Sequence, residues 1–110
     1  MERRRHPRFD MRQLVELGFG RERFVHAEGV NISRSGIWCQ TSEELEVSAT
    51  VSIYFTLDDD EEEPETLTAD AVVKRCDPRG DEVYDVGMEF SSMSSRTERR
   101  LEEFFASRST

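Results

Sequence analysis

The chain has 110 residues and a formal net charge of −9 at pH 7, with 35% hydrophobic and 35% charged residues, which predicts one globular domain with a modest core. The acidic balance argues against bulk binding of DNA, RNA or anionic membranes, and no apolar run resembles a transmembrane span or a signal peptide. The two cysteines, Cys39 and Cys76, are too few for a disulfide scaffold, so we expect a reduced, cytoplasmic protein without membrane insertion.

The N-terminal segment, residues 1–12, differs in charge from the rest of the chain, and we call it the arginine arm. It contains five arginines against Glu2 and Asp10 and therefore carries a charge of +3. Residues 58–65, the acidic tract, contain seven carboxylates and no base, so the chain outside this tract carries only −2. A local site for an anion is therefore compatible with a globally acidic protein.

The first half of the chain predicts three strands. Residues 13–19 place apolar side chains at every second position, and residues 23–32 follow after a short turn as the returning strand. Gly29 within that strand indicates a bulge or a close backbone approach. Residues 31–36 have the composition of a loop, and a third short strand begins at Ile37.

The second half predicts three further strands. Apolar and polar residues alternate over residues 50–57, 66–73 and 84–90, which is the period of a strand with one buried face. The acidic tract between the first two is expected to be a solvated hairpin loop. Residues 77–81, Asp-Pro-Arg-Gly-Asp, have strong turn chemistry and predict the turn before the last strand.

The last segment, residues 94–107, predicts a helix. Ser95-Arg96-Thr97-Glu98 matches a capping box, in which the serine oxygen and the glutamate satisfy opposite backbone donors. Leu101, Phe104 and Phe105 follow at helical spacing, although the two adjacent phenylalanines are not expected to point straight inward together. Short strands joined by turns predict an all-β fold, an antiparallel barrel or sandwich, with this helix covering one open end or side.

Two polar motifs stand out, Arg4-x-x-x-Arg8 in the arginine arm and Asn31-x-Ser33-x-x-Gly36 in the first loop. In this order they resemble the paired signature of the PilZ domain family, RxxxR followed by (D/N)xSxxG. Residues 86–90, Val-Gly-Met-Glu-Phe, are similar to the end of that family's last barrel strand. The resemblance covers nearly the whole chain.

The resemblance implies a six-stranded antiparallel β-barrel that binds the bacterial second messenger cyclic dimeric GMP (c-di-GMP). It also implies a single domain over residues 1–110, with the arginine arm at 1–12, the barrel at 13–91 and the helix at 94–107. The implied ligand-binding residues are Arg4, Arg8, Asn31, Ser33 and Gly36, and we add Arg3, Arg5 and Arg34 as further candidates.

The chemistry of these residue types fits such a ligand. An arginine pairs bidentately with guanine O6 and N7 and also stacks on a base, whereas lysine offers a point charge. Ser33 can donate to a phosphate oxygen, Gly36 permits a close backbone approach, and the amide of Asn31 can bond the guanine edge. Arg3 and Arg5 could stack on a second ligand, so one or two ligands per protomer are both compatible with the sequence.

Plainer interpretations stay open for several of these features. The arginine arm alone could be a solubilising tail, and Asn31 to Gly36 alone could be an ordinary loop. His6 and His26 are expected to face solvent, without a metal site, and Trp38 is expected to have a structural role close to the ligand site. The acidic tract could also bind a partner.

The function that we expect is a receptor and adaptor, without catalysis and without a cofactor. Ligand binding would order the mobile arginine arm across the barrel and change the surface that a downstream protein detects. That protein could belong to the motility, pilus, exopolysaccharide or virulence machinery. The alternatives are a ligand-blind PilZ-fold adaptor and, less in keeping with the acidic charge, a small barrel that binds single-stranded nucleic acid.

Overall fold

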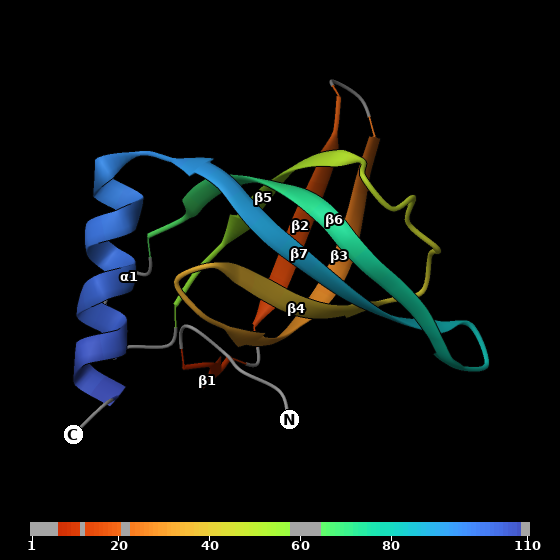
Figure 1. Ribbon diagram of the computed structural model, residues 1–110, viewed down its shortest axis with the longest axis horizontal. Coiled ribbons are helices and arrows are strands. Elements are labelled where there is room, and N and C mark those ends of the chain that lie inside the picture. The colour runs from red at the N-terminus through yellow and green to blue at the C-terminus, as the bar shows by residue number, and fades with distance from the viewer. Residues whose placement is uncertain (1–6, 12, 21–22, 58–64, 109–110) are drawn as a thin grey trace.

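The structure, a computed structural model, describes residues 7–11, 13–20, 23–57 and 65–108. Within these ranges the chain forms seven strands and one helix (Figure 1). In chain order the elements are β1 (Phe9–Asp10), β2 (Leu14–Phe19), β3 (Arg23–Ile32), β4 (Gly36–Thr41), β5 (Thr50–Phe55), β6 (Leu67–Gly80), β7 (Val83–Met93) and α1 (Ser95–Arg108). No helix in these ranges is both long and apolar enough to cross a membrane.

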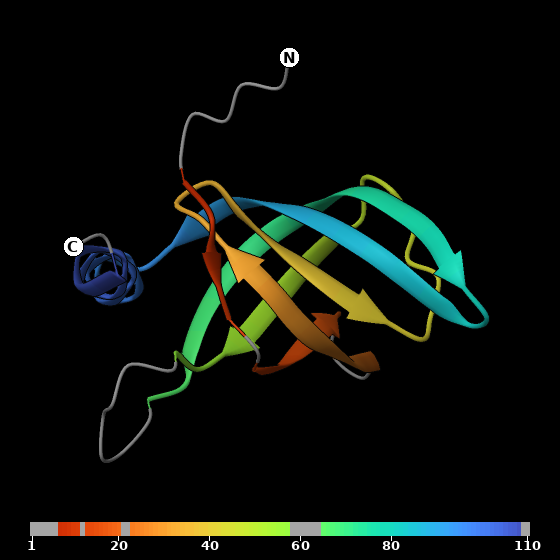
Figure 2. The ribbon, with the colours of Figure 1, turned by 90° about the horizontal axis from the view of Figure 1, so that it is seen from below.

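Six strands, β2 to β7, close into an antiparallel barrel. Each strand pairs with the next in the order β2, β5, β6, β7, β4 and β3, and β3 pairs again with β2. Figure 2 shows this ring of strands, with α1 standing at one end of it. Closure gives the wall strands a hydrogen-bonding partner on both sides and removes the exposed sheet edge, which confirms the predicted six-stranded barrel.

The barrel core follows from the alternation of apolar residues in the sequence. In β5 and in the first half of β6 every second side chain points inward and is at most 3% exposed. These inward side chains are Val51, Ile53, Phe55, Leu67, Ala69, Ala71 and Val73. Removing them from water is the main contribution to stability, at about 25 cal/mol for each Å² of apolar surface.

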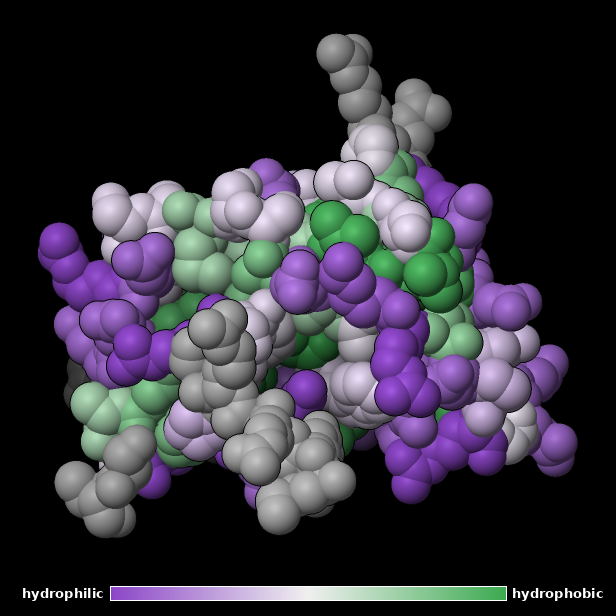
Figure 3. Space-filling view, in the orientation of Figure 1, coloured by the Kyte–Doolittle hydropathy of each residue, from purple (hydrophilic) through white to green (hydrophobic). Residues whose placement is uncertain are grey.

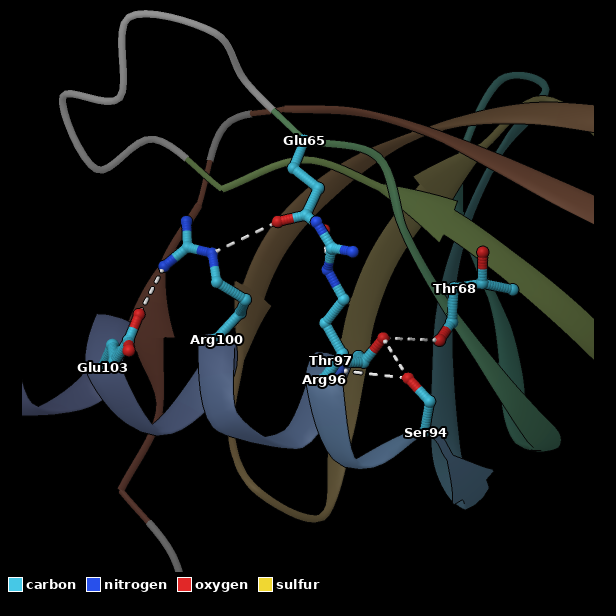
Figure 4. A network of polar contacts seen from close by, with 7 residues as sticks. All are labelled: Glu65, Thr68, Ser94, Arg96, Thr97, Arg100 and Glu103. Carbon is cyan, nitrogen blue, oxygen red and sulfur yellow. Dashed lines mark hydrogen bonds and ion pairs between the residues drawn. The ribbon is translucent and has the colours of Figure 1, made fainter.

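The start of α1 lies one residue away from the predicted cap. We expected Ser95 to cap the helix, but the side chain of Ser94 does so, because its Oγ accepts the N–H of Thr97 at 3.1 Å. The carbonyl of Ser94 accepts the N–H of Glu98 at 3.0 Å. Thr97 fixes the residue at which the helix begins, since its buried hydroxyl donates to the carbonyl of Thr68 in β6 at 3.1 Å (Figure 4).

A charged network holds the same end of α1 against the barrel. The carboxylate of Glu65, which precedes β6, pairs with Arg96 and lies 3.6 Å from Nε of Arg100 (Figure 4). Arg100 also pairs with Glu103 at 3.0 Å. Glu65 is the last residue of the acidic tract, and the solvated loop expected for residues 58–64 lies outside the described residues.

Aromatic packing holds the other half of α1. Phe104 and Phe105 are both buried, at 1% and 4% exposure, although the two adjacent side chains were not expected to point inward together. Phe9 covers them, because its ring stacks on Phe105 at 5.1 Å between centroids and meets Phe104 edge-on at 6.5 Å. Phe9 belongs to β1, which pairs with the end of β3, so the arginine arm contains a short strand that the sequence did not indicate.

The turn between β6 and β7 also differs from the prediction. β6 continues through residues 77–80, and the turn consists of Asp81 and Glu82, with Gly80 opposite Val83. Pro78 is tolerated inside β6 because the pairing of β6 with β5 ends near Val72, so the missing N–H of the proline faces an open edge. The two strands therefore extend beyond the barrel as a long hairpin.

Candidate ligand-binding site

Asn31 reaches the outer surface of the barrel because β3 contains a bulge. Between residues 25 and 29 every odd-numbered residue is buried, so strict alternation would also bury residue 31. β3 accommodates one extra residue between Gly29 and Asn31, and Asn31 pairs with Trp38 of β4. The bulge reverses the alternation, so that Ile32 is fully buried and Asn31 lies on the outside beside Trp38. Gly29 thus has the role that the sequence indicated.

The ring of Trp38 lies across the neighbouring strand β7. Trp38 pairs with Asn31 of β3 on one side and with Gly87 of β7 on the other, so the three residues form one transverse row. A Cβ atom at Gly87 would lie 2.6 Å from Cζ3 of Trp38, which means that the ring occupies the space above the glycine. Trp38 therefore has the expected structural role and lies beside the predicted site residues.

Arg8 contacts both of these outward side chains. Its Nη1 donates to Oδ1 of Asn31 at 3.1 Å, and its Cζ lies 5.8 Å from the centroid of the Trp38 ring, within the range of a cation–π interaction. The pairing of Asp10 with Asn31 directs the arm toward this point. The last arginine of RxxxR and the first residue of NxSxxG are therefore in direct contact.

The second motif forms a tight loop whose shape depends on Ser33 and Gly36. Ser33 is only 3% exposed, its N–H donates to the carbonyl of Gly36 at 2.9 Å, and its Oγ accepts the N–H of Ser35 at 3.2 Å. A Cβ atom at Gly36 would collide with the carbonyl oxygen of Met88 in β7. The close approach expected at Gly36 is thus an approach to the barrel wall.

Arg8, Ser33 and Trp38 line one hollow of about 200 Å³ on the outer face of the barrel. The other charged side chains of its lining are Lys74, Arg75 and Glu89, so the described lining carries a net positive charge. Two larger hollows, of about 490 and 470 Å³, lie beside α1, and each is lined by more carboxylates than bases. An anionic ligand is therefore favoured in the smaller hollow.

Figure 3 shows the face of the molecule that β6 and β7 cross in Figure 1. Hydrophilic side chains form a band over the middle of this face, and apolar side chains lie above the band.

Lys74 and Arg75 of β6 are both exposed. They lie in neither sequence motif, although two consecutive charges directly after the buried Val73 break the alternation and could have indicated a bulge.

Of the other predicted arginines, only Arg34 is described by the structure, and it does not line this hollow. Arg34 points to α1, where its Nη1 donates to Oε1 of Glu102 at 3.1 Å. Arg3, Arg4 and Arg5 lie outside the described residues, so their part in the site stays a prediction.

The remaining reactive side chains have other environments. Within the described residues, no group of three or more His, Cys, Asp or Glu could hold a metal ion. His26 is exposed, with its Nε2 atom 3.3 Å from Oε2 of Glu16. Burial raises the pKa of Cys39 to about 12, so this thiol is neutral at physiological pH. Cys76 is half-buried, and its sulfur accepts the N–H of Leu45 at 3.3 Å.

The fold has known counterparts among solved structures. The inhibitor of motility MotI/DgrA of Bacillus subtilis matches with a TM-score of 0.82 at 20% identity, covering 99% of this chain and 52% of that one. The PilZ domain of Escherichia coli YcgR, solved with c-di-GMP, matches with a TM-score of 0.73 at 15% identity, covering 96% and 91% of the two chains. The MrkH–c-di-GMP complex of K. pneumonia matches with a TM-score of 0.72 at 19% identity, covering 96% and 52%.

This chain therefore spans about half the length of the MotI/DgrA and MrkH chains and most of the YcgR domain. A comparison with curated protein sequences found no match. The family model of the PilZ domain matches residues 2–107, which is nearly the entire sequence. The chain thus belongs to the PilZ domain family.

Proposed function

We propose that this chain is a cytoplasmic receptor and adaptor for c-di-GMP and not an enzyme. The observation that carries the proposal is the meeting of the two motifs, with Arg8 bonded to Asn31 and placed over Trp38 at the edge of a cationic hollow. Two of the similar structures, YcgR and MrkH, were solved with c-di-GMP. The free thiols of Cys39 and Cys76 suit a reducing compartment.

The proposed contacts follow from the chemistry of the ligand, which has two guanines and two phosphates. The guanidinium of Arg8 can leave the Asn31 amide and pair with guanine O6 and N7, which is worth about 1–3 kcal/mol of discrimination. Asn31 would then bond the guanine edge, and the hydroxyl of Ser33 or its neighbour Ser35 would donate to a phosphate oxygen. The hollow, of about 200 Å³, is smaller than the whole ligand. Part of a bound ligand would therefore project from the hollow, and Arg4 and the rest of the arginine arm would cover that part.

We further propose that α1 relays the occupancy of the site. Two residues adjacent to site residues contact the same helix: Phe9, next to Arg8, stacks on Phe105, and Arg34, next to Ser33, pairs with Glu102. A ligand that draws the arm and the loop together would pull on both contacts. The surface around α1 is therefore the region that a downstream protein would detect.

Isothermal titration calorimetry with c-di-GMP tests the receptor proposal. We expect saturable binding with a micromolar or lower Kd, and the fitted stoichiometry distinguishes one ligand from two. Arg8→Ala and Ser33→Ala should each weaken binding by roughly tenfold or more. Arg23→Ala, at the opposite end of β3, and Ser52→Ala, on β5, are matched controls and should bind like the unmodified protein.

Two results would contradict the proposal. Absence of heat at high ligand concentration, with a folded protein by circular dichroism, would favour the ligand-blind adaptor. Binding that is equally weakened by Arg8→Ala and Arg23→Ala would indicate general charge attraction and not a site at the hollow.

A further inference from the structure

A bulge in β6 places two basic residues side by side on the outside of the barrel. β6 pairs with β7 as Val73 with Met88 and then Arg75 with Gly87, so Lys74 is the extra residue. Val73 is fully buried, whereas both Lys74 and Arg75 are exposed. Without the bulge, strict alternation would turn one of these two cations into the core.

The bulge also extends the row of outward residues described above. Arg75 is opposite Gly87, and Gly87 is opposite Trp38, which in turn is opposite Asn31. Gly87 has no side chain, and the Trp38 ring lies over it, so the ring occupies the position between the arm on one side and β6 on the other. Lys74 and Arg75 line the same hollow as Arg8.

The present partners of these two cations are exposed and exchangeable. Lys74 Nζ lies 3.8 Å from Oε1 of Glu89, and Arg75 Nη2 lies 3.0 Å from Oδ2 of Asp77. In each pair both side chains are at least half exposed, and ion pairs of this kind contribute little to stability. A phosphate that enters the hollow can therefore replace the carboxylates without a large penalty.

We propose that Lys74 and Arg75 form a third wall of the ligand site, which binds phosphate oxygens opposite Arg8, with the Trp38 ring as the surface between them. This inference rests on the proposed c-di-GMP function and adds residues that lie in neither motif. The walls of the site suit different parts of the ligand. Arg8 and Asn31 suit the edge of a guanine, and the flat indole of Trp38 suits the face of a base. The β6 pair suits the negative charge of the phosphates, because a lysine ammonium is a point charge.

The chain contains one tryptophan, so the fluorescence of Trp38 reports on the hollow without labelling. Titration with c-di-GMP should change this fluorescence in a saturable way. Lys74→Ala and Arg75→Ala should each raise the Kd about tenfold, which corresponds to about 1.4 kcal/mol, while the signal at saturation stays the same. Arg79→Ala is the matched control, because Arg79 lies on the same hairpin, is equally exposed and pairs with Asp85.

Glu89→Gln provides a test in the opposite direction. Glu89 pairs with Lys74 and is the carboxylate in the described lining, so its neutralisation should lower the Kd several-fold. A weakened affinity in Glu89→Gln would mean that this carboxylate itself holds the ligand and would overturn the assignment of Lys74.

The outcomes separate this inference from the proposed function. If the unmodified protein binds and Arg8→Ala weakens binding, but the double variant of Lys74 and Arg75 binds normally, the third wall is wrong and the receptor stands. An equal loss in the double variant and in Arg79→Ala would also overturn it, since long-range charge would then suffice. If the unmodified protein does not bind c-di-GMP, the proposed function itself fails.

Discussion

Replacing Gly36 with alanine separates two roles that the motif glycine could have, a contact with ligand and a contact with the barrel. The added methyl group would collide with the carbonyl oxygen of Met88 and lie 3.4 Å from Cα of Glu89. These are backbone atoms of β7, which is paired with β4 at this position, so they cannot rotate away as a flexible side chain would. Overpacking of this kind costs about 1–3 kcal/mol, and we expect the upper end of that range.

The matched control is Gly80→Ala, because nothing lies within 4 Å of a Cβ atom at Gly80 and its φ is not in the left-handed region. That variant should stay within about 0.5 kcal/mol of the unmodified protein. Urea unfolding, followed by circular dichroism, measures both free energies of unfolding, and the melting temperature of Gly36→Ala should fall by about 10 °C. If Gly36→Ala is as stable as Gly80→Ala and loses only ligand binding, the structural role that we assign to this glycine is wrong.

Three further predictions concern the surroundings of the site. Phe9→Ala should lower the free energy of unfolding by about 1–3 kcal/mol in urea, since it removes a half-buried ring from the aromatic cluster on α1; an unchanged stability would contradict the proposed link between arm and helix. Gly87→Ala should displace the Trp38 ring and shift its fluorescence emission even without ligand, whereas an unchanged spectrum would show that the ring does not lie over the glycine. At pH 8 a thiol reagent should label Cys76 but not Cys39 in the native protein, because burial raises the pKa of Cys39 to about 12 and keeps that thiol neutral far above pH 8; two labelled thiols per native molecule would refute this.

The alternation of apolar residues was sufficient to predict the strands, whereas their closure into a six-stranded barrel was implied by the resemblance to the PilZ family. Val51, Ile53 and Phe55 alternate with polar residues in the sequence and are all buried in the structure. The period of two residues is a local property, so it survives without knowledge of the partners of each strand. The helix was equally predictable, because Leu101 and Phe104 follow at helical spacing and are both buried.

Features that depend on tertiary contacts could not be predicted in this way. The sequence at Asp77-Pro78 has turn composition, but the hairpin continues because the open edge of β6 needs no N–H from the proline. β1 is too short to show a period, and it exists because the half-buried ring of Phe9 packs against the aromatic rings of α1. Ser94 caps the helix in place of the predicted Ser95, because the hydroxyl of Thr97 is bonded to the carbonyl of Thr68 in β6.

The candidate site likewise combines residues that the sequence predicted with features that depend on tertiary contacts. The motifs selected Arg8, Asn31 and Ser33, and the structure places Arg8 and Ser33 in the lining of one hollow, with Asn31 bonded to Arg8. Gly29 indicated a bulge, but the sequence did not reveal that Asn31 faces outward, because the position of the extra residue depends on the register between strands. For the same reason Lys74 and its neighbour were not selected, since their common exposure follows from a second bulge.

Mapping the ligand onto the folded protein tests the central claim most directly. Amide chemical shifts of the isotope-labelled protein, recorded during titration with c-di-GMP, should change most at Arg8, at residues 31–38 and at residues 74–75, with smaller changes at Phe105. A matched titration with Arg8→Ala should suppress these changes. Shifts that cluster instead at the hollows beside α1, or an unchanged spectrum at saturating ligand, would contradict a c-di-GMP site between the arginine arm and the barrel wall.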